Sequence, residues 1–111
     1  MIEKVVRDYL ATETGLPAYM EIPEKPDDEY LIVEKTGSGR ENHINRATIA
    51  VQSYSRKSLL RAATINEQVK TVMDSLIELP EISRSQLNSD YNYTDTTTAT
   101  YRYQAVYDIV Y

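Results

Sequence analysis

The sequence predicts a single α+β domain over residues 1–111, in which an antiparallel or mixed β-sheet carries two helices on one face. Its length of 111 residues suits one hydrophobic core and is too short for two. Two segments have the apolar spacing of amphipathic helices, and five shorter ones are β-branched, aromatic or alternating. The expected order is therefore α-β-β-β-α-β-β. Helices with one apolar side each must cover one face of the sheet.

The chain is expected to begin with a helix and a short strand. Apolar residues recur at every third or fourth position from Ile2 to Leu10, which is the spacing of one helix face. Gly15 is a common helix-ending residue, and a proline follows two positions later. A short strand is expected within residues 18–23, and the charged, proline-containing residues 24–29 form a connector.

Two strands joined by an exposed loop are expected next. Residues 30–35 are mostly apolar and partly β-branched, so this strand should be buried on much of both faces. Residues 36–43 contain two of the three glycines and no large apolar side chain, which predicts an exposed, mobile hairpin tip. Residues 44–54 alternate as a long strand does. The side chains expected on one face are Ala47, Ile49 and Val51, and those on the other are Arg46, Thr48, Ala50 and Gln52.

The second helix is predicted from a sustained 3.6-residue pattern that ends at Pro80. Ser55 is its expected N-cap, with residues 56–58 in the first turn. The stripe is interrupted only by Asn66 and consists of Leu59, Ala62, Ala63, Val69, Val72, Met73, Leu76 and Ile77.

A closing hairpin completes the predicted fold. Residues 81–93 form a polar strand candidate, with Leu87, Tyr91 and Tyr93 on one side. A turn follows at residues 95–97. The last strand, residues 99–111, alternates most clearly, and one face carries Ala99, Tyr101, Tyr103, Ala105, Tyr107, Ile109 and Tyr111.

Composition excludes several classes of function. The absence of cysteine excludes disulfides, zinc–thiolate sites, iron–sulfur clusters and thiol catalysis. The 17 acidic and 12 basic side chains give a net charge of −5, which disfavours binding to nucleic acid. No stretch approaches the roughly 20 apolar residues needed to cross a bilayer, so no membrane partner is expected. Ten tyrosines, without phenylalanine or tryptophan, favour half-buried positions such as sheet faces and interfaces.

No group of residues predicts catalysis, a cofactor or a metal site, so the protein is not expected to be an enzyme. His43 is the single histidine, and its loop offers no apolar residue to build a catalytic pocket. The acidic residues 27–29 lack the spaced ligands and glycine of a calcium loop. Gly37-Ser38-Gly39 lacks the lysine and following helix of a phosphate-binding loop. The remaining nucleophile candidates lack the flanking glycines of a nucleophile elbow; they are Ser53, Ser55 and Ser58.

The tyrosines of the closing hairpin have two interpretations. As core residues, they pack beneath the helices. As interface residues, they are partly exposed anchors for a partner, and the candidates are Tyr91, Tyr93, Tyr101 and Tyr103. The interpretations are compatible, because one hairpin can be buried at its base and exposed at its tip.

The element order resembles that of the tail terminator, or tail-to-head joining, proteins of long-tailed double-stranded DNA phages. In that family a strand ending in an aromatic residue passes through a small polar residue into a helix. Residues 49–55, Ile-Ala-Val-Gln-Ser-Tyr-Ser, carry this resemblance here, and the last strand also fits. The helix residues that contribute to it are Ala62, Ile65, Val69, Met73 and Leu76.

The resemblance implies a structural, non-enzymatic role in the virion. Such proteins form a ring, usually of six copies, that caps the growing tail tube and docks on the head connector. The expected partners are other copies of this chain, a tail tube protein and a head–tail connector protein, assembled in the host cytoplasm. DNA is expected to pass through the channel without specific binding, because an acidic subunit repels it.

Ring contacts are expected on sheet edges and exposed loops. The predicted interface therefore combines the loop of residues 36–43 with the hairpin of residues 91–101, and three arginines supply pairing charges. The interface candidates are Gly37, Ser38, Gly39, Arg40, His43, Arg46, Tyr91, Tyr93, Tyr101 and Arg102.

Two other functions fit the same sequence. One is another head–tail connector or completion protein of the same virion. The other is a small cytoplasmic adaptor that binds a protein partner with its tyrosine-rich sheet. A hydrolase-like enzyme would need a paired acid and base in a pocket, and the sequence offers no such pair.

Overall fold

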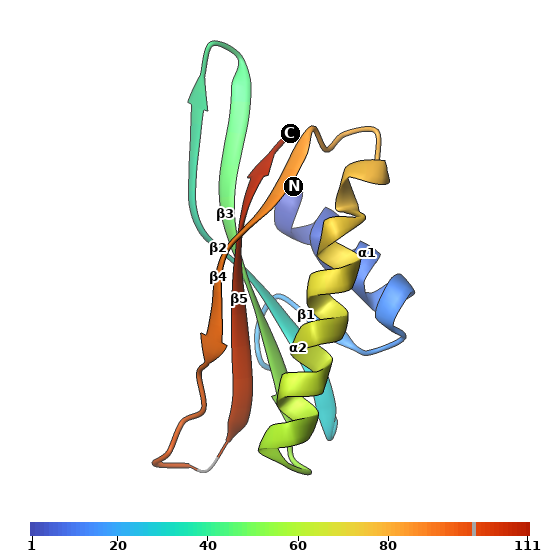
Figure 1. The fold of residues 1–111 in the computed structure, drawn as a ribbon, viewed down its shortest axis with the longest axis vertical. Helices are drawn as coiled ribbons and strands as arrows, with labels where there is room; N and C mark the ends of the chain where they lie inside the picture. The colour runs from blue at the N-terminus through green and yellow to red at the C-terminus, as the bar shows by residue number, and fades with distance from the viewer. Residues whose placement is uncertain (99) are drawn as a thin grey trace.

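The computed structural model describes residues 1–98 and 100–111 and confirms the predicted fold class. Two helices lie on one face of a five-stranded mixed sheet, in the predicted order and with a short 3-10 helix (η1) after the second α-helix (Figure 1). Ala99, the first residue of the predicted last strand, lies outside the described residues. The elements are α1 (Ile2–Thr14), β1 (Ala18–Tyr19), β2 (Glu29–Glu41), β3 (Ile44–Ser55), α2 (Leu59–Asp74), η1 (Leu76–Glu78), β4 (Arg84–Asn92) and β5 (Tyr101–Val110).

The strands lie in the order β1-β2-β3-β5-β4. β1 is parallel to β2 and pairs with it only at Leu31 and Ile32, whereas the other pairings are antiparallel. Within the described residues, most of the outer edge of β2 and the whole outer edge of β4 therefore lack a neighbouring strand. We call the face of the sheet that points away from the helices the open face.

The hydrophobic core lies between the helices and the other face of the sheet. α1 buries Ile2, Val6 and Leu10 at the spacing that the sequence predicted. Gly15 ends this helix in the left-handed conformation, with a φ of 73°, which glycine adopts without a steric penalty. The sheet and α2 contribute the buried residues Leu31, Val33, Ala47, Ile49, Val51, Ile65, Val69, Met73, Ala105, Tyr107 and Ile109.

The prediction of a loop over residues 36–43 is wrong in its secondary structure, because β2 continues to Glu41. The chain reverses at Asn42 and His43 alone, with the positive φ values of 50° and 65° that a type I′ turn requires. Residues 37–41 pair with β3 across the hairpin, so the glycines Gly37 and Gly39 lie within a strand, and Thr36 lies at a shift of register between Lys35 and Gly37. The predicted exposure is confirmed, since every residue from 34 to 44 is exposed.

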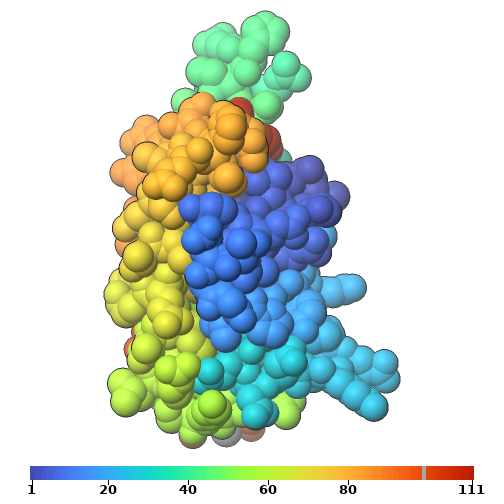
Figure 2. Space-filling model, turned by 90° about the vertical axis from the view of Figure 1, so that its right-hand side faces the viewer, coloured from blue at the N-terminus to red at the C-terminus, as the bar shows by residue number. Residues whose placement is uncertain are grey.

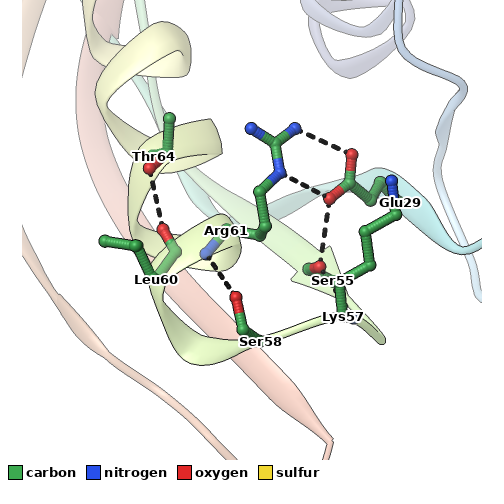
Figure 3. Close-up of polar contacts among 7 residues, drawn as sticks. All are labelled: Glu29, Ser55, Lys57, Ser58, Leu60, Arg61 and Thr64. Carbon is green, nitrogen blue, oxygen red and sulfur yellow. Dashed lines mark hydrogen bonds and ion pairs between the residues drawn. The ribbon is translucent and has the colours of Figure 1, made fainter.

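α2 begins later than predicted. Ser58, not Ser55, is the N-cap, and its Oγ accepts a hydrogen bond from the backbone N–H of Arg61 at 3.1 Å. Ser55 instead ends β3, where its hydroxyl donates to Glu29 and accepts from the backbone N–H of Lys57, both at 3.1 Å (Figure 3). Both serines match the capping preference, and the length of β3 decides between them.

An ion pair joins the start of α2 to the start of β2. Arg61 donates from Nε and Nη2 to the two carboxylate oxygens of Glu29, each at 2.9 Å (Figure 3). The Arg61 hydrogen bonds, with a further one from Ser55, lower the pKa of Glu29 from 4.5 to about 2. This pair fixes the end of the molecule opposite the β2–β3 turn.

A bulge in β4 changes which face its tyrosines occupy. The register with β5 shifts by one residue between Leu87 and Ser89. Because side chains alternate along a strand, an extra residue reverses the faces beyond it. Leu87 lies opposite Tyr107 on the helix side, whereas Tyr91 lies on the open face. The prediction that Leu87 shares a face with Tyr91 and Tyr93 is therefore wrong.

Candidate interaction surfaces

The structure separates the predicted interface residues into two groups toward opposite ends of the sheet (Figure 1). One group lies on the β2–β3 hairpin, and the other lies at the end of β4 and the start of β5. The first group is Gly37, Ser38, Gly39, Arg40, His43 and Arg46, and the second is Tyr91, Tyr93, Tyr101 and Arg102. These residues therefore do not form one surface, and within the second group Tyr101 points to the helix side of the sheet whereas Tyr91 and Arg102 lie on the open face.

The β2–β3 hairpin projects beyond the body of the molecule (Figures 1 and 2). β3 pairs with β5 only from Arg46 onward, so among the described residues only at the hairpin tip, residues 40–45, do both strands have no strand neighbour outside the hairpin. A Cβ atom added at Gly37 or Gly39 would meet no other atom within 4 Å. His43 Nδ1 faces Nη2 of Arg40 at 3.4 Å, a cation and not the carboxylate that orients a catalytic imidazole. Among the described residues, the side-chain partner of the His43 ring is therefore Arg40, which lies on the same hairpin.

The free edges of β2 and β4 lie at the same height along the sheet. Two rows of paired residues show this, and they are Gly39–Arg46–Val110–Arg84 and Val33–Val51–Ala105–Asp90. β1 pairs with β2 only at Leu31 and Ile32, which lie outside these two rows, on the side away from the β2–β3 turn. The described chain therefore presents unpaired backbone at matching heights on both sides of its sheet.

A row of aromatic side chains and one arginine crosses the open face, at the end away from the hairpin. Tyr30 and Tyr54 stack, with ring centroids 4.6 Å apart and planes 8° from parallel. Tyr19 meets Tyr30 edge-on at 6.3 Å. The Arg102 guanidinium lies 4.5 Å from the centroid of Tyr93 and 5.7 Å from that of Tyr54. The row thus reaches from β1 to the end of β4.

A chain of hydrogen bonds fixes these side chains in place. Arg102 Nη1 donates to the Tyr54 hydroxyl at 3.0 Å, and that hydroxyl donates to Gln52 Oε1 at 3.0 Å. Gln52 Nε2 donates to Gln104 Oε1 at 2.9 Å, and Gln104 Nε2 donates to the Tyr91 hydroxyl at 2.5 Å. Both glutamines are buried although no helix covers this face. The open face therefore carries an ordered polar and aromatic cluster, in which Tyr91 and Tyr93 are exposed and Tyr30 and Tyr54 are buried.

Replacing Tyr54 by phenylalanine is expected to lower the free energy of unfolding by about 1 kcal/mol, because Gln52 Oε1 loses its donor and Arg102 Nη1 loses its acceptor. Tyr91→Phe is the matched control. Tyr91 is 41% exposed, so water can replace its hydroxyl and the loss should be smaller. Urea unfolding followed by circular dichroism measures both, and equal losses would contradict the assigned role of the Tyr54 hydroxyl.

The sequence placed Gln52 on the face of β3 away from the core, but it did not predict that Tyr30, Gln52 and Gln104 are buried on that face. The signal was the alternation of β3, which places Gln52 and Tyr54 with the polar side chains that point away from the core. The cross-strand partners of these residues depend on pairing between β2, β3 and β5, which the sequence does not contain.

Two of the three acidic residues considered for a cation site have other side-chain partners. Asp27 accepts a hydrogen bond from the Tyr19 hydroxyl at 2.7 Å, and Glu29 is paired with Arg61. Residues 1–98 and 100–111 contain no group of three or more His, Asp or Glu side chains that could hold a metal ion. None of the helices in these ranges is long and apolar enough to cross a membrane.

Comparison with known proteins adds no relative. A scan of protein-family models and a search of curated proteins each return no match to this chain.

Proposed function

We propose that this protein is a structural subunit that joins neighbouring sheets edge to edge into a closed ring, and that the ring terminates a phage tail tube and connects it to the head. The observation that carries the proposal is the matching height of the free edges of β2 and β4. An exposed edge is a template for pairing with another chain. A protein with two such edges on opposite sides offers the two halves of a head-to-tail contact.

The strand directions support closure. β2 and β4 run in opposite directions, because three successive antiparallel pairings separate them. If copies are related by rotation about an axis along the strands, β4 of one copy meets β2 of the next in antiparallel orientation. No shift along the axis is needed, because the edges lie at one height. Such a contact generates a ring when the rotation closes.

The ends of the molecule support a joining role. The β2–β3 hairpin projects at one end, and the β4–β5 hairpin lies at the other (Figure 1). A ring of such subunits has two different faces, one for the tail tube protein and one for the head connector. The net charge of −5 favours a channel through which DNA slides. This assignment places the protein in the virion, with assembly in the host cytoplasm.

Charged substitutions at the two edges test the ring. Gly37 and Gln86 lie in one register row through Thr48 and Asp108, and both are exposed. Gly37→Glu combined with Gln86→Glu is expected to convert rings to monomers, because like charges would meet at the contact. Gly37→Glu combined with Gln86→Lys is expected to restore them. Light scattering and electron microscopy measure the species present, with and without the tail tube protein.

The matched control places two negative charges on the exposed side of α2, as Gln68→Glu with Thr71→Glu. This variant should assemble as the unmodified protein does. A chain that stays monomeric at every concentration and with the tube protein added would overturn the proposal. So would equal assembly of the like-charged and opposite-charged pairs.

A second candidate is a protein-binding adaptor, favoured by the ordered aromatic row on the open face. Such a module would work as a monomer. Gene order separates the candidates: a major tail protein encoded immediately downstream supports the terminator, and a metabolic operon supports the adaptor. Another head–tail connector would share the virion neighbourhood, and localisation in the particle by electron microscopy distinguishes it.

A further inference from the structure

A pocket of about 560 Å³ opens at the end of the molecule away from the β2–β3 turn. Its lining comes from the connector before β2, from the ends of β2, β3 and β5 and from the β4–β5 loop. The lining residues that matter here are Ile22, Pro26, Tyr30, Tyr54, Arg56 and Arg102. A concave site with apolar walls and a few convergent polar groups is the usual form of a binding pocket.

Three hydrogen-bond donors in this pocket have unused capacity. The Tyr30 hydroxyl and the Arg56 guanidinium make no hydrogen bond or ion pair with any described residue. Arg102 uses Nε for the Tyr93 carbonyl and Nη1 for the Tyr54 hydroxyl, which leaves Nη2 without a partner in the described chain. All three groups can donate, and the two guanidinium groups can only donate, so together they favour an anionic acceptor.

The guanidinium groups lie close enough to Tyr30 to affect its hydroxyl. Burial raises the pKa of Tyr30, and the neighbouring Tyr54 raises it further, whereas Arg56 and Arg102 lower it. The carboxylate of Asp95 also lines the pocket, but its Oδ1 accepts from the backbone N–H of Thr97 at 2.9 Å. In a chain of net charge −5, the pocket thus holds two arginines against one locally bonded carboxylate.

We propose that this pocket binds an acidic peptide segment of a partner protein, with a carboxylate between Arg56, Arg102 and the Tyr30 hydroxyl. A guanidinium fork matches the two oxygens of a carboxylate. Ile22 and Pro26 supply an apolar wall for a neighbouring aliphatic side chain. The inference does not depend on the proposed ring, because one copy of the chain carries the whole pocket.

The packing of the tyrosine side chains favours a peptide over a nucleotide as the ligand. A nucleotide base binds most strongly on an open aromatic face. Tyr30 already has Tyr54 stacked on one side and Tyr19 packed against it edge-on. Tyr54 packs against Tyr30 and lies beside the Arg102 guanidinium. The rings therefore offer edges and hydroxyl groups to a ligand, which suit the polar groups and short side chains of a peptide.

Fluorescence anisotropy with a labelled Glu-Glu-Leu-Glu-Glu peptide tests the proposal. The expected result is saturable binding with a Kd below about 1 mM, and at least about tenfold weaker binding of the Gln-Gln-Leu-Gln-Gln peptide. Arg56→Gln and Tyr30→Phe should each weaken binding of the acidic peptide by about tenfold. Arg40→Gln removes the same charge at the opposite end of the molecule and should leave binding unchanged.

Three outcomes would overturn the proposal: no binding of the acidic peptide, equal loss in Arg56→Gln and Arg40→Gln, or binding of adenosine monophosphate instead of the peptide. Amide chemical shifts of the unmodified protein give a readout that does not depend on any variant folding. The acidic peptide should shift the amides of Tyr30, Arg56 and Arg102. Shifts confined to the β2–β3 hairpin would count against the pocket. Peptide binding by a protein that stays monomeric would support the pocket and contradict the ring, so the two proposals can fail independently.

Discussion

Replacing Tyr107 by alanine is expected to lower the free energy of unfolding by about 3 to 5 kcal/mol, a large part of the roughly 5 to 15 kcal/mol typical of a domain. Tyr107 is completely buried and is the largest of the fully buried side chains. It lies on β5 between Ile49 of β3 and Leu87 of β4, beneath α2. Removing its ring leaves a cavity where the sheet meets the helix, because neighbouring side chains collapse only partly into such a space.

Tyr107→Phe distinguishes the contribution of the aromatic ring to stability from that of the hydroxyl. The hydroxyl donates to the backbone carbonyl of Lys70 at 3.5 Å, a long hydrogen bond. Its loss should therefore cost only about 0.5 to 1 kcal/mol, while the ring continues to fill the core. Urea unfolding at neutral pH measures both variants. A loss below about 1 kcal/mol for Tyr107→Ala would contradict the central position of this side chain.

The ion pair between Glu29 and Arg61 is expected to make stability depend on pH in the acid range. The pKa of Glu29 is about 2 in the folded protein, below its ordinary value of 4.5, so folding favours the ionised form. Its contribution is therefore fully present above about pH 4.5 and is lost as the pH falls from 4.5 toward 2. Arg61 is partly open to solvent, and screening limits the contribution to about 1 to 2 kcal/mol.

Glu29→Gln should remove this dependence. The variant is expected to lose about 1 to 2 kcal/mol at pH 7 and to converge with the unmodified protein as the pH falls toward and below 2, where Glu29 becomes protonated in the folded chain as it already is in the unfolded chain. Glu67→Gln is the control, because Glu67 forms an exposed pair with Lys70 whose loss should cost little. Unfolding curves between pH 2 and 7 measure the difference. A constant gap between Glu29→Gln and the unmodified protein over that range would show that the lost stability is not due to the charge.

The proposed edge contacts and the proposed peptide pocket use different parts of the molecule. The edges run along the sides of the sheet, whereas the pocket lies at the end opposite the hairpin turn. A ring would therefore leave the pocket of each copy free for a neighbouring component. Substitutions at Gly37 or Gln86 should leave peptide binding intact, and Arg56→Gln should leave assembly intact.

Local periodicity was sufficient to predict the main elements. The 3.6-residue spacing from Ile2 to Leu10 and along residues 59–73 reflects helices that bury one side, and the alternation of β3 reflects a strand with one core face. These signals depend only on each segment and the presence of a core. They therefore predict the fold class and the placement of both helices on one face.

Details that depend on a neighbouring strand were not predictable in this way. Two glycines suggested a loop at residues 36–43, yet pairing with β3 extends β2 to a two-residue turn at Asn42 and His43. Ser55 and Ser58 are equally good caps in isolation, and the pairing of Ser55 with Tyr101 and Glu29 assigns it to the sheet.

The sequence by itself determined an acidic α+β domain with one core, two amphipathic helices and a tyrosine-rich strand, because composition and periodicity are properties of single segments. Tertiary structure alone decided the bulge that moves Tyr91 to the open face, the equal height of the free edges, and the gathering of Tyr30, Arg56 and Arg102 around one pocket. The physical reason is that strand register is a relation between distant segments, and a shift of one residue reverses every side chain beyond it.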